Sequence, residues 1–182
     1  MTTAYKTLNG MTGSYGHGDY YDYMPHGKRP GKWLPKVEPV LCESGYHVCA
    51  DPMDCLTHYG PDLWEVEVRG GCDEGDDKQA WEQMRLVRRN PHWTDANLRL
   101  FAVDCARQVA HLTDNPELMH ACLDVCVAYA EYGEEWAAAW DAAAAAAWDA
   151  AGAAAWDAAG DAAWDAERKW QAVRLMEVIG DD

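Results

Sequence analysis

The stretch LWEVEVRG at residues 63–70 gives the clearest indication of how the first half of the chain folds. Over residues 64–69, one tryptophan and two valines alternate with two glutamates and one arginine. Because neighbouring side chains of a strand point to opposite faces, this alternation predicts a β-strand with one covered face and one polar face. The first half of the chain is therefore expected to contain a sheet.

Short segments around this strand complete the expected sheet. Residues 50–60 (ADPMDCLTHYG) are typical of a short helix, because Asp51 can cap it, Pro52 suits its first turn and Gly60 with the next proline stops it. The other stretches with strand-like composition are VEPVLCE (37–43), GYHVC (45–49) and WEQMRLVRR (81–89).

Residues 9–36 are rich in glycine, tyrosine and proline, show no period and predict a long loop. Two interpretations of its aromatic rings stay open. In the first, which we favour over a ligand-binding role, the rings fold down over the sheet as a lid. In the second, they contact a partner protein. The aromatic residues assigned to this interaction surface are Tyr15, Tyr20, Tyr21, Tyr23 and Trp33.

After Asn90 the apolar period becomes helical. Thr94 or Asp95 can cap a first helix, and Asn115 followed by proline begins a second helix that ends at Gly133. An alanine-rich helical region then runs from 134 to about 179–180. The side chains expected to face inward are Leu98, Phe101, Cys105, Val109 and Leu112, then Leu118, Cys122, Val125, Cys126 and Tyr129.

A Trp-Asp pair recurs every eight residues in the alanine-rich region, with its tryptophans at Trp140, Trp148, Trp156 and Trp164. Eight residues leave an offset of ~80° on a helix, so these rings cannot form one stripe. A single helix over 134–179 would be ~69 Å long, which favours a break at Gly152 or Gly160. We expect the rings to hold helices together, within one chain or between copies in a homo-oligomer.

These patterns predict an α+β protein. A small antiparallel-rich sheet with a short helix and the Tyr/Gly-rich loop would occupy residues 1–90. An alanine- and tryptophan-rich helical bundle would occupy residues 91–182 and pack against it.

The formal charge of -16 limits the partners. Residues 1–93 carry 10 basic and 14 acidic groups, and residues 94–182 carry 5 and 17. Because binding to phosphates or to anionic lipid needs clustered Lys and Arg, neither direct nucleic-acid binding nor membrane binding is expected. A DNA mimic is less favoured, since the repeat offers one Asp per ~12 Å of helix against one charge per ~1.7 Å of duplex.

Localisation and metal binding are predicted from what the sequence lacks. A charged segment followed by an apolar run is not found at the start, and no stretch reaches ~18 apolar residues, so a soluble cytoplasmic protein is expected. Seven cysteines without any CxxC spacing favour reduced thiols over disulfides or a zinc site. We therefore expect no metal.

Residues 41–68, LCESGYHVCADPMDCLTHYGPDLWEVEV, resemble a domain of unknown function seen in bacteriophage and actinobacterial proteins, with a recurring "lCe-GfH-C" core. The resemblance continues to residue 89 through DDKQAWEQMRLVRR. From His92 onward, HWTDANLRLFAVDCARQVAHL and the tail ending in AERKWQAVRL resemble the helical half of actinobacterial proteins labelled as immunity proteins. Together these resemblances imply a phage or toxin-conflict context.

A second resemblance concerns enzymes. Tyr-Lys at 5–6, the aromatic, Cys and Asp-Pro pattern of 46–52 and the VEV strand resemble the core of ADP-ribosyltransferases, which use NAD and a catalytic glutamate. The chain lacks the Ser-Thr-Ser segment and paired glutamates of those enzymes. The residues that this resemblance implies at an NAD site are Tyr5, Tyr46, His47, Glu65 and Glu67.

Among common catalytic motifs, GxSxG, P-loop, GxGxxG and HExxH are all missing from the sequence. We therefore favour a non-catalytic acidic interaction protein, an inhibitor or immunity factor that binds an unidentified protein and needs no cofactor. The alternative is an NAD-using, ADP-ribosyltransferase-like enzyme in the first half.

Overall fold

The structure, a computed structural model, describes residues 2–13, 19–56, 60–113, 115–132 and 161–180, with the side chains of 161–165 left out. The chain divides into two compact units, residues 1–93 (unit 1) and 94–182 (unit 2). Unit 1 contains an antiparallel sheet, and unit 2 contains helices. The α+β class predicted from the sequence is confirmed.

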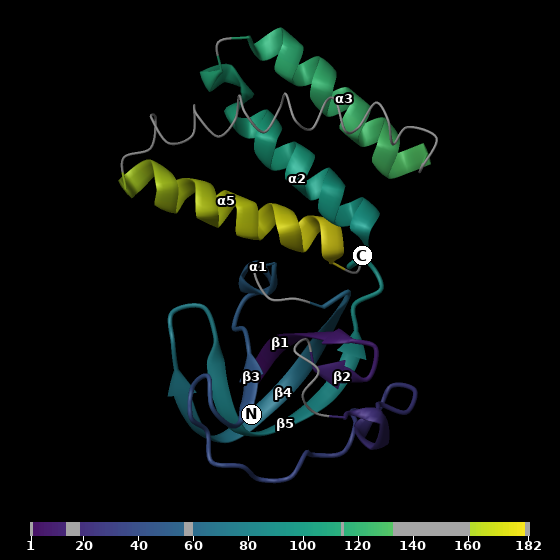
Figure 1. Cartoon of the computed structure of the whole chain (residues 1–182), viewed down its shortest axis with the longest axis vertical. Coiled ribbons are helices and arrows are strands. Elements are labelled where there is room, and N and C mark those ends of the chain that lie inside the picture. Colours follow the sequence, from purple (N-terminus) through teal and green to yellow (C-terminus); the bar gives the residue numbers. More distant parts are fainter. Residues whose placement is uncertain (1, 14–18, 57–59, 114, 133–160, 181–182) are drawn as a thin grey trace. The chain divides into compact units, whose positions relative to one another are not determined.

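The sheet of unit 1 has five strands in the order β2-β1-β4-β5-β3 (Figure 1). Three of them, β3, β4 and β5, form where strands were predicted around 45–49, 63–70 and 81–89. The strands are β1 (Thr2–Asn9), β2 (Thr12–Gly13), β3 (Tyr46–Val48), β4 (Asp62–Glu74) and β5 (Gln79–Arg89).

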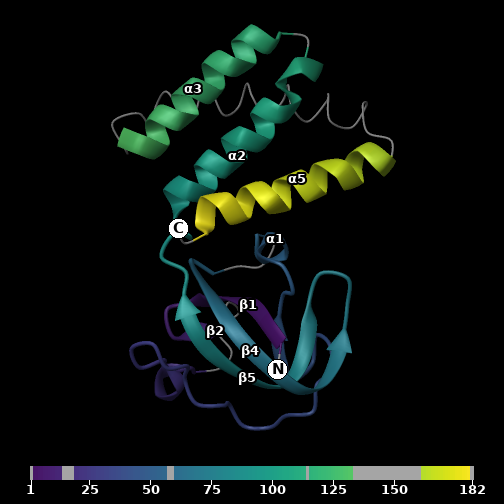
Figure 2. The ribbon, with the colours of Figure 1, turned by 180° about the vertical axis from the view of Figure 1, so that it is seen from behind.

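The sheet curls until β1 meets the residue that follows β3. Tyr5 and Cys49 form an antiparallel bridge in which the amide of each donates to the carbonyl of the other at 2.8 Å. Figure 2 shows this curled sheet from behind. The curl brings β3, which begins 37 residues after β1 ends, against β1.

The core of unit 1 lies inside the curl. On β4 the buried side chains alternate with half-buried charged ones, as the LWEVEVRG pattern predicted. Burial of this apolar area, at about 25 cal/mol per Å², is the main stabilising term for such a small sheet. The core residues are Ala4, Leu8, Tyr20, Leu34, Val48, Trp64, Val66, Val68, Met84 and Leu86.

The prediction of a strand at 37–43 is wrong. Val40 and Ser44 pair across a turn, and Cys42 has a φ of 65°, in the left-handed region. Pro39 has no N–H to offer a strand partner, and a left-handed residue cannot continue an extended strand. The apolar run of this segment therefore forms a turn.

The described parts of the long loop expected at 9–36, residues 9–13 and 19–36, contain more regular structure than the sequence suggested. It includes β2 and a short 3-10 helix, η1 (Tyr21–Tyr23). The amides of Gly31, Leu34 and Val37 donate to the carbonyls of β5 residues 86, 84 and 82 at 2.8, 2.9 and 3.1 Å. This segment therefore covers an edge of β5 that would otherwise expose unpaired backbone groups.

The short helix of unit 1 forms as predicted. Helix α1 (Pro52–Cys55) has proline in its first turn, and the Asp51 carboxylate accepts a hydrogen bond from the Met53 amide at 2.8 Å. Such a cap satisfies an amide that lacks a partner within the helix.

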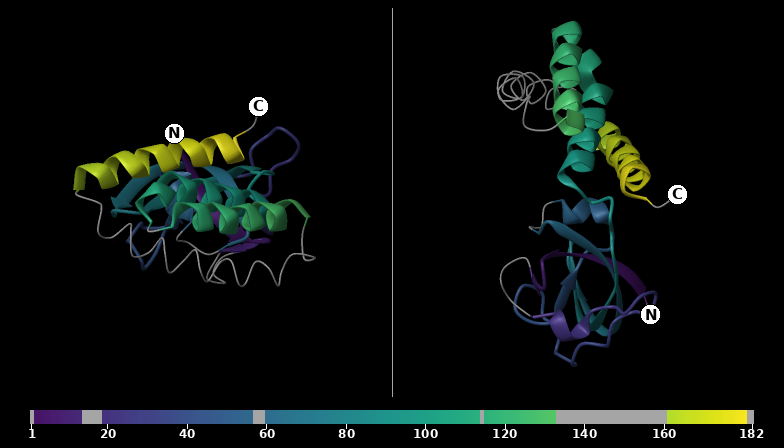
Figure 3. Two further views of the ribbon diagram at one scale, coloured as in Figure 1. Left: turned by 90° about the horizontal axis from the view of Figure 1, so that it is seen from above. Right: turned by 90° about the vertical axis from the view of Figure 1, so that its right-hand side faces the viewer.

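Unit 2 contains the helices α2 (Asp95–Val109), η2 (Ala110–Leu112), α3 (Pro116–Tyr132) and α5 (Asp161–Ile179). The predicted caps are confirmed, because Thr94 accepts from the Asn97 amide and Asn115 accepts from the Leu118 amide. Figure 3 shows α2 and α3 lying side by side. An ion pair of 2.7 Å between Arg174 and Asp104 joins α5 to α2.

The inward face of these helices differs from the expected one at two leucines. Leu118 is 55% exposed, and the buried side chains of α3 are Met119, Leu123 and Cys126, a face that begins one residue later. Leu112 is 42% exposed because it lies in η2, where three residues per turn carry it away from the α2 face.

Several expectations concern parts of the chain that the structure does not describe. Tyr15, Trp140, Trp148 and Trp156 lie outside the described residues, as do the glycines at which a break was expected. Trp164 lies in α5, but its side chain is not described. The role of the eight-residue repeat therefore stays a prediction.

Among the described helices, none combines the length and the apolar character that crossing a membrane requires. Within the same described residues, three or more His, Cys, Asp or Glu side chains do not converge where they could hold a metal ion.

Core packing in unit 1 can be tested with two leucines that differ in exposure. Leu86 is fully buried and Leu56 is 40% exposed. We expect Leu86→Ala to lower the free energy of unfolding by about 2–5 kcal/mol, because it leaves a cavity, and Leu56→Ala to lower it by less than about 1 kcal/mol. Urea denaturation followed by circular dichroism measures both. Equal losses would contradict the position of the core.

Candidate functional site

The turn before β3 is held by a histidine. The Cys42 amide donates to Nε2 of His47 at 2.9 Å, which fixes the left-handed residue of the turn. Burial lowers the pKa of His47, and the nearby charges of Lys6 and Lys78 lower it further. A neutral imidazole can accept this hydrogen bond, so His47 has a structural role here.

A lysine and two cysteines gather where β1 meets the end of β3. The ammonium group of Lys6 donates to the carbonyl of His47 at 2.7 Å. Burial lowers the pKa of Lys6 to about 8. Cys49 and Cys55 are buried, and a hydrogen bond between their side chains, together with burial, raises the pKa of Cys55. The Cys55 thiol is therefore protonated and poorly reactive in this fold.

The two candidate glutamates lie on the face of β4 opposite the core, where each is paired with an arginine of β5. Glu65 contacts Arg88 at 2.6 Å, and Glu67 forms an ion pair with Arg85. In both pairs, the two residues are direct cross-strand register partners. Either carboxylate would have to leave its arginine before it could bind a substrate hydroxyl.

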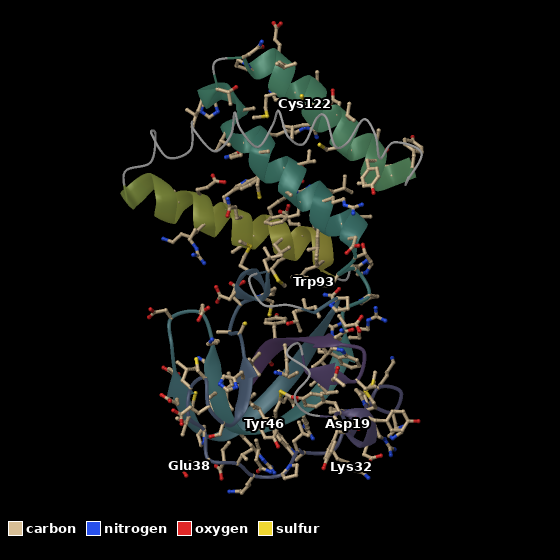
Figure 4. The ribbon with its side chains drawn as sticks, viewed as in Figure 1. Asp19, Lys32, Glu38, Tyr46, Trp93 and Cys122 are labelled. Atoms are coloured by element: carbon tan, nitrogen blue, oxygen red, sulfur yellow. The ribbon has the colours of Figure 1, made fainter. Side chains whose placement is uncertain are left out.

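The remaining residues of the enzyme hypothesis are spread over different contacts. Tyr5 is the register partner of Glu65, and its pKa is raised first by burial and then by that carboxylate. Tyr46, labelled in Figure 4, packs against the core and its hydroxyl donates to the Pro35 carbonyl at 2.8 Å. The structure thus makes Tyr5 and Glu65 neighbours and engages Tyr46, His47 and Glu67 elsewhere.

The aromatic residues assigned to an interaction surface divide into two groups. Tyr20 belongs to the core and is 6% exposed, and Tyr23 packs against that core, as in the lid interpretation. Burial, followed by the effect of Tyr46, raises the pKa of Tyr20 to about 12. Tyr21, in contrast, is 72% exposed and available to a partner. Tyr20 is not.

Trp33 lies under two arginine side chains. The guanidinium carbons of Arg69 and Arg85 are 3.9 and 4.7 Å from its ring centroid. Such cation–π contacts contribute about 0.5–1 kcal/mol each at exposed sites. The ring therefore fixes its own segment on the outer face of the sheet.

Two charged surfaces of unit 1 were not assigned a role from the sequence. The acidic hairpin tip, residues 72–78, comprises the last three residues of β4 and the turn that leads into β5, and it exposes Asp73, Glu74, Asp76 and Asp77. The basic segment, residues 26–36, contains Lys28, Arg29, Lys32 and Lys36 and no acidic residue. A count of charge in short windows would have found both.

Comparison with known protein families places unit 1 within one family. A model of the family described as Domain of unknown function (DUF7666) matches residues 3–97. This stretch includes the strands β1 to β5 and α1, and it is longer than the 41–89 in which the sequence indicated a domain of unknown function. No curated protein and no solved structure matches the chain.

The burial of Lys6 predicts how stability depends on pH. Between the folded pKa of about 8 and the ordinary value of 10.5, the unfolded chain binds more protons than the folded chain, so stability should rise with pH. We expect the free energy of unfolding of the wild type, relative to that of Lys6→Met, to rise by on the order of 2 kcal/mol across this window.

Urea denaturation at pH values from 7 to 10 measures this difference. The exposed Lys32 provides the control, since Lys32→Met should differ from the wild type by a constant amount. A flat difference for Lys6→Met as well would contradict the desolvation of its ammonium group.

Proposed function

This chain belongs to that family of unknown function, and we propose that it is a non-catalytic acidic protein that binds and inhibits, or gives immunity to, a protein partner with a basic surface. The observation that carries the proposal is the acidic hairpin tip, where four exposed carboxylates accompany one lysine, Lys78. A partner with clustered Lys and Arg would find complementary charge there.

The tip is held in a fixed geometry by the turn that precedes β3. The Gly75 amide donates to the Lys78 carbonyl at 2.9 Å and closes the hairpin. One carboxylate oxygen of Asp73 accepts from the Leu41 amide at 2.8 Å. A Cβ on Gly75 would lie 2.7 Å from the Leu41 side chain, so turn and tip are in close contact. This preorganisation lowers the entropy that binding would cost.

The enzyme alternative is less well supported by the same contacts. An ADP-ribosyltransferase-like reaction needs a carboxylate free to hold the ribose hydroxyls of NAD, and Glu65 and Glu67 are engaged with Arg88 and Arg85. The pairing of Tyr5 with Glu65 is the one feature that favours it. In our proposal no cofactor takes part.

The proposal also includes the biological setting and the location of the protein. A bacteriophage or actinobacterial conflict setting and a cytoplasmic location follow from the sequence resemblances and composition. Homo-oligomer formation through the Trp/Ala helices would be a further property of the same protein.

The acidic tip can be tested with matched triple variants. Glu74→Gln, Asp76→Asn and Asp77→Asn together leave Asp73 in place to hold Leu41. Three exposed ion pairs are worth about 1–2 kcal/mol, so we expect this variant to bind the partner roughly tenfold more weakly. Proteins retained by the immobilised chain from a host lysate are identified, and the affinity of the principal one is then measured.

The control carries the same charge change elsewhere in unit 1, at the exposed residues Asp22, Glu38 and Glu43. It should bind as the wild type does. Equal binding by both triple variants would overturn the role of the tip. A rise in melting temperature with NAD that Glu65→Gln abolishes would instead support the enzyme alternative.

A further inference from the structure

The basic segment is an exception in an acidic chain. Lys28, Arg29 and Lys32 are exposed, and none of them forms an ion pair with any other residue that the structure describes. Figure 4 places Lys32 at the periphery of unit 1. With a formal charge of -16 on the whole chain, a stretch of eleven residues with four cations and no carboxylate needs a physical explanation.

Hydrogen bonds hold the backbone that carries these cations in place. His26 and Arg29 exchange two backbone hydrogen bonds of 3.1 and 3.2 Å, which close a tight turn around the first cations. The bonds from Gly31 and Leu34 to β5 then hold the next part of the segment along the sheet. Trp33 adds its contacts with two arginines. The charges are therefore displayed at set positions rather than on a mobile loop.

A complementary surface exists on unit 2 of the same chain. Glu117, Asp124 and Glu131 are exposed and follow each other at intervals of seven residues on α3. Seven residues bring a helix back to within ~20° of the same face, with a spacing of ~10.5 Å. Leu118 and Tyr132, beside them in sequence, are 55% and 67% exposed. We call this surface the acidic face of α3.

The spacings of the two surfaces are compatible. Lys28, Lys32 and Lys36 are separated by four residues, which span at most ~14 Å in an extended chain. The difference from ~10.5 Å is well within the reach of lysine and glutamate side chains. Glu117 and Glu131 are exposed, and neither forms an ion pair with another residue that the structure describes.

The existing pairs at these surfaces are weak enough to exchange. Lys36 contacts Glu82 at 2.7 Å with its side chain 69% exposed, and Asp124 contacts Arg107 at 2.7 Å with its side chain 73% exposed. Exposed ion pairs contribute about 0–1 kcal/mol each, so a new partner could replace them at little cost.

We propose that the basic segment of one copy binds the acidic face of α3 of a second copy, so that the chain associates with itself through opposite charges. Each copy carries both surfaces, which makes the contact heterologous. A nucleic acid fits this segment less well, because bases would have to compete with Arg69 and Arg85 for stacking on the Trp33 ring. The proposal does not depend on the acidic hairpin tip.

Charge reversal on either surface tests the contact. Sedimentation velocity of the full chain should show concentration-dependent association at about 0.1 M salt that is lost towards 1 M, where the Debye length falls from about 10 to about 3 Å. Lys28→Glu with Lys32→Glu, and separately Glu117→Lys with Glu131→Lys, should each weaken association at least tenfold. Circular dichroism confirms that each variant is folded.

Mixing the two variants provides the sharpest outcome. The reversed segment of the first variant then meets the reversed α3 face of the second, and association should return towards the wild-type level. The control, Asp22→Lys with Glu43→Lys, changes the net charge as the α3 variant does and lies on neither surface. It should self-associate at least as well as the wild type.

Two results would overturn the proposal. One is a wild type that sediments as a single monomeric species at low salt over the full concentration range. The other is a double variant of either surface that associates as strongly as the wild type. If the wild type stays monomeric but binds a single-stranded oligonucleotide through Lys28 and Lys32, the basic segment serves a nucleic acid instead.

Discussion

The fold of unit 1 depends on the backbone bridge between Tyr5 and Cys49. Two hydrogen bonds of 2.8 Å close the curl of the sheet and bring the segment around β3 against β1. The contact of Lys6 with the His47 carbonyl, and its closeness to the two buried thiols, follow from this closure. A buried ammonium is costly unless it is partnered, so the curl fixes both the shape of the unit and its most unusual electrostatic feature.

The turn before β3 links the interior of the sheet to its charged periphery. Cys42 takes a left-handed conformation that the imidazole of His47 secures, and Leu41 holds the carboxylate of Asp73. Residues that resemble catalytic groups in sequence thus act here as supports. His47 has its acceptor nitrogen occupied, and Glu65 and Glu67 neutralise arginines across the strand pair. These contacts are the reason that we propose a binding role rather than NAD chemistry.

Opposite charges cluster on different segments of this chain. The basic segment is held along β5, while carboxylates gather at the hairpin tip and along one side of α3. Surface charge contributes little to the stability of a single fold, but it selects partners and speeds their encounter. This clustering of charge is the basis on which we propose a basic partner and self-association.

Local signals in the sequence were enough to predict several elements. Alternation predicted β4, the Asp-Pro and Asn-Pro pairs predicted the starts of α1 and α3, and the change of period predicted the helices of unit 2. Tertiary structure alone decided that the apolar segment around Pro39 turns, that Tyr20 is buried while Tyr21 is exposed, and that Leu118 faces solvent. These outcomes depend on which surfaces meet after the sheet curls and the helices pack, and contacts between residues distant in sequence leave no local pattern.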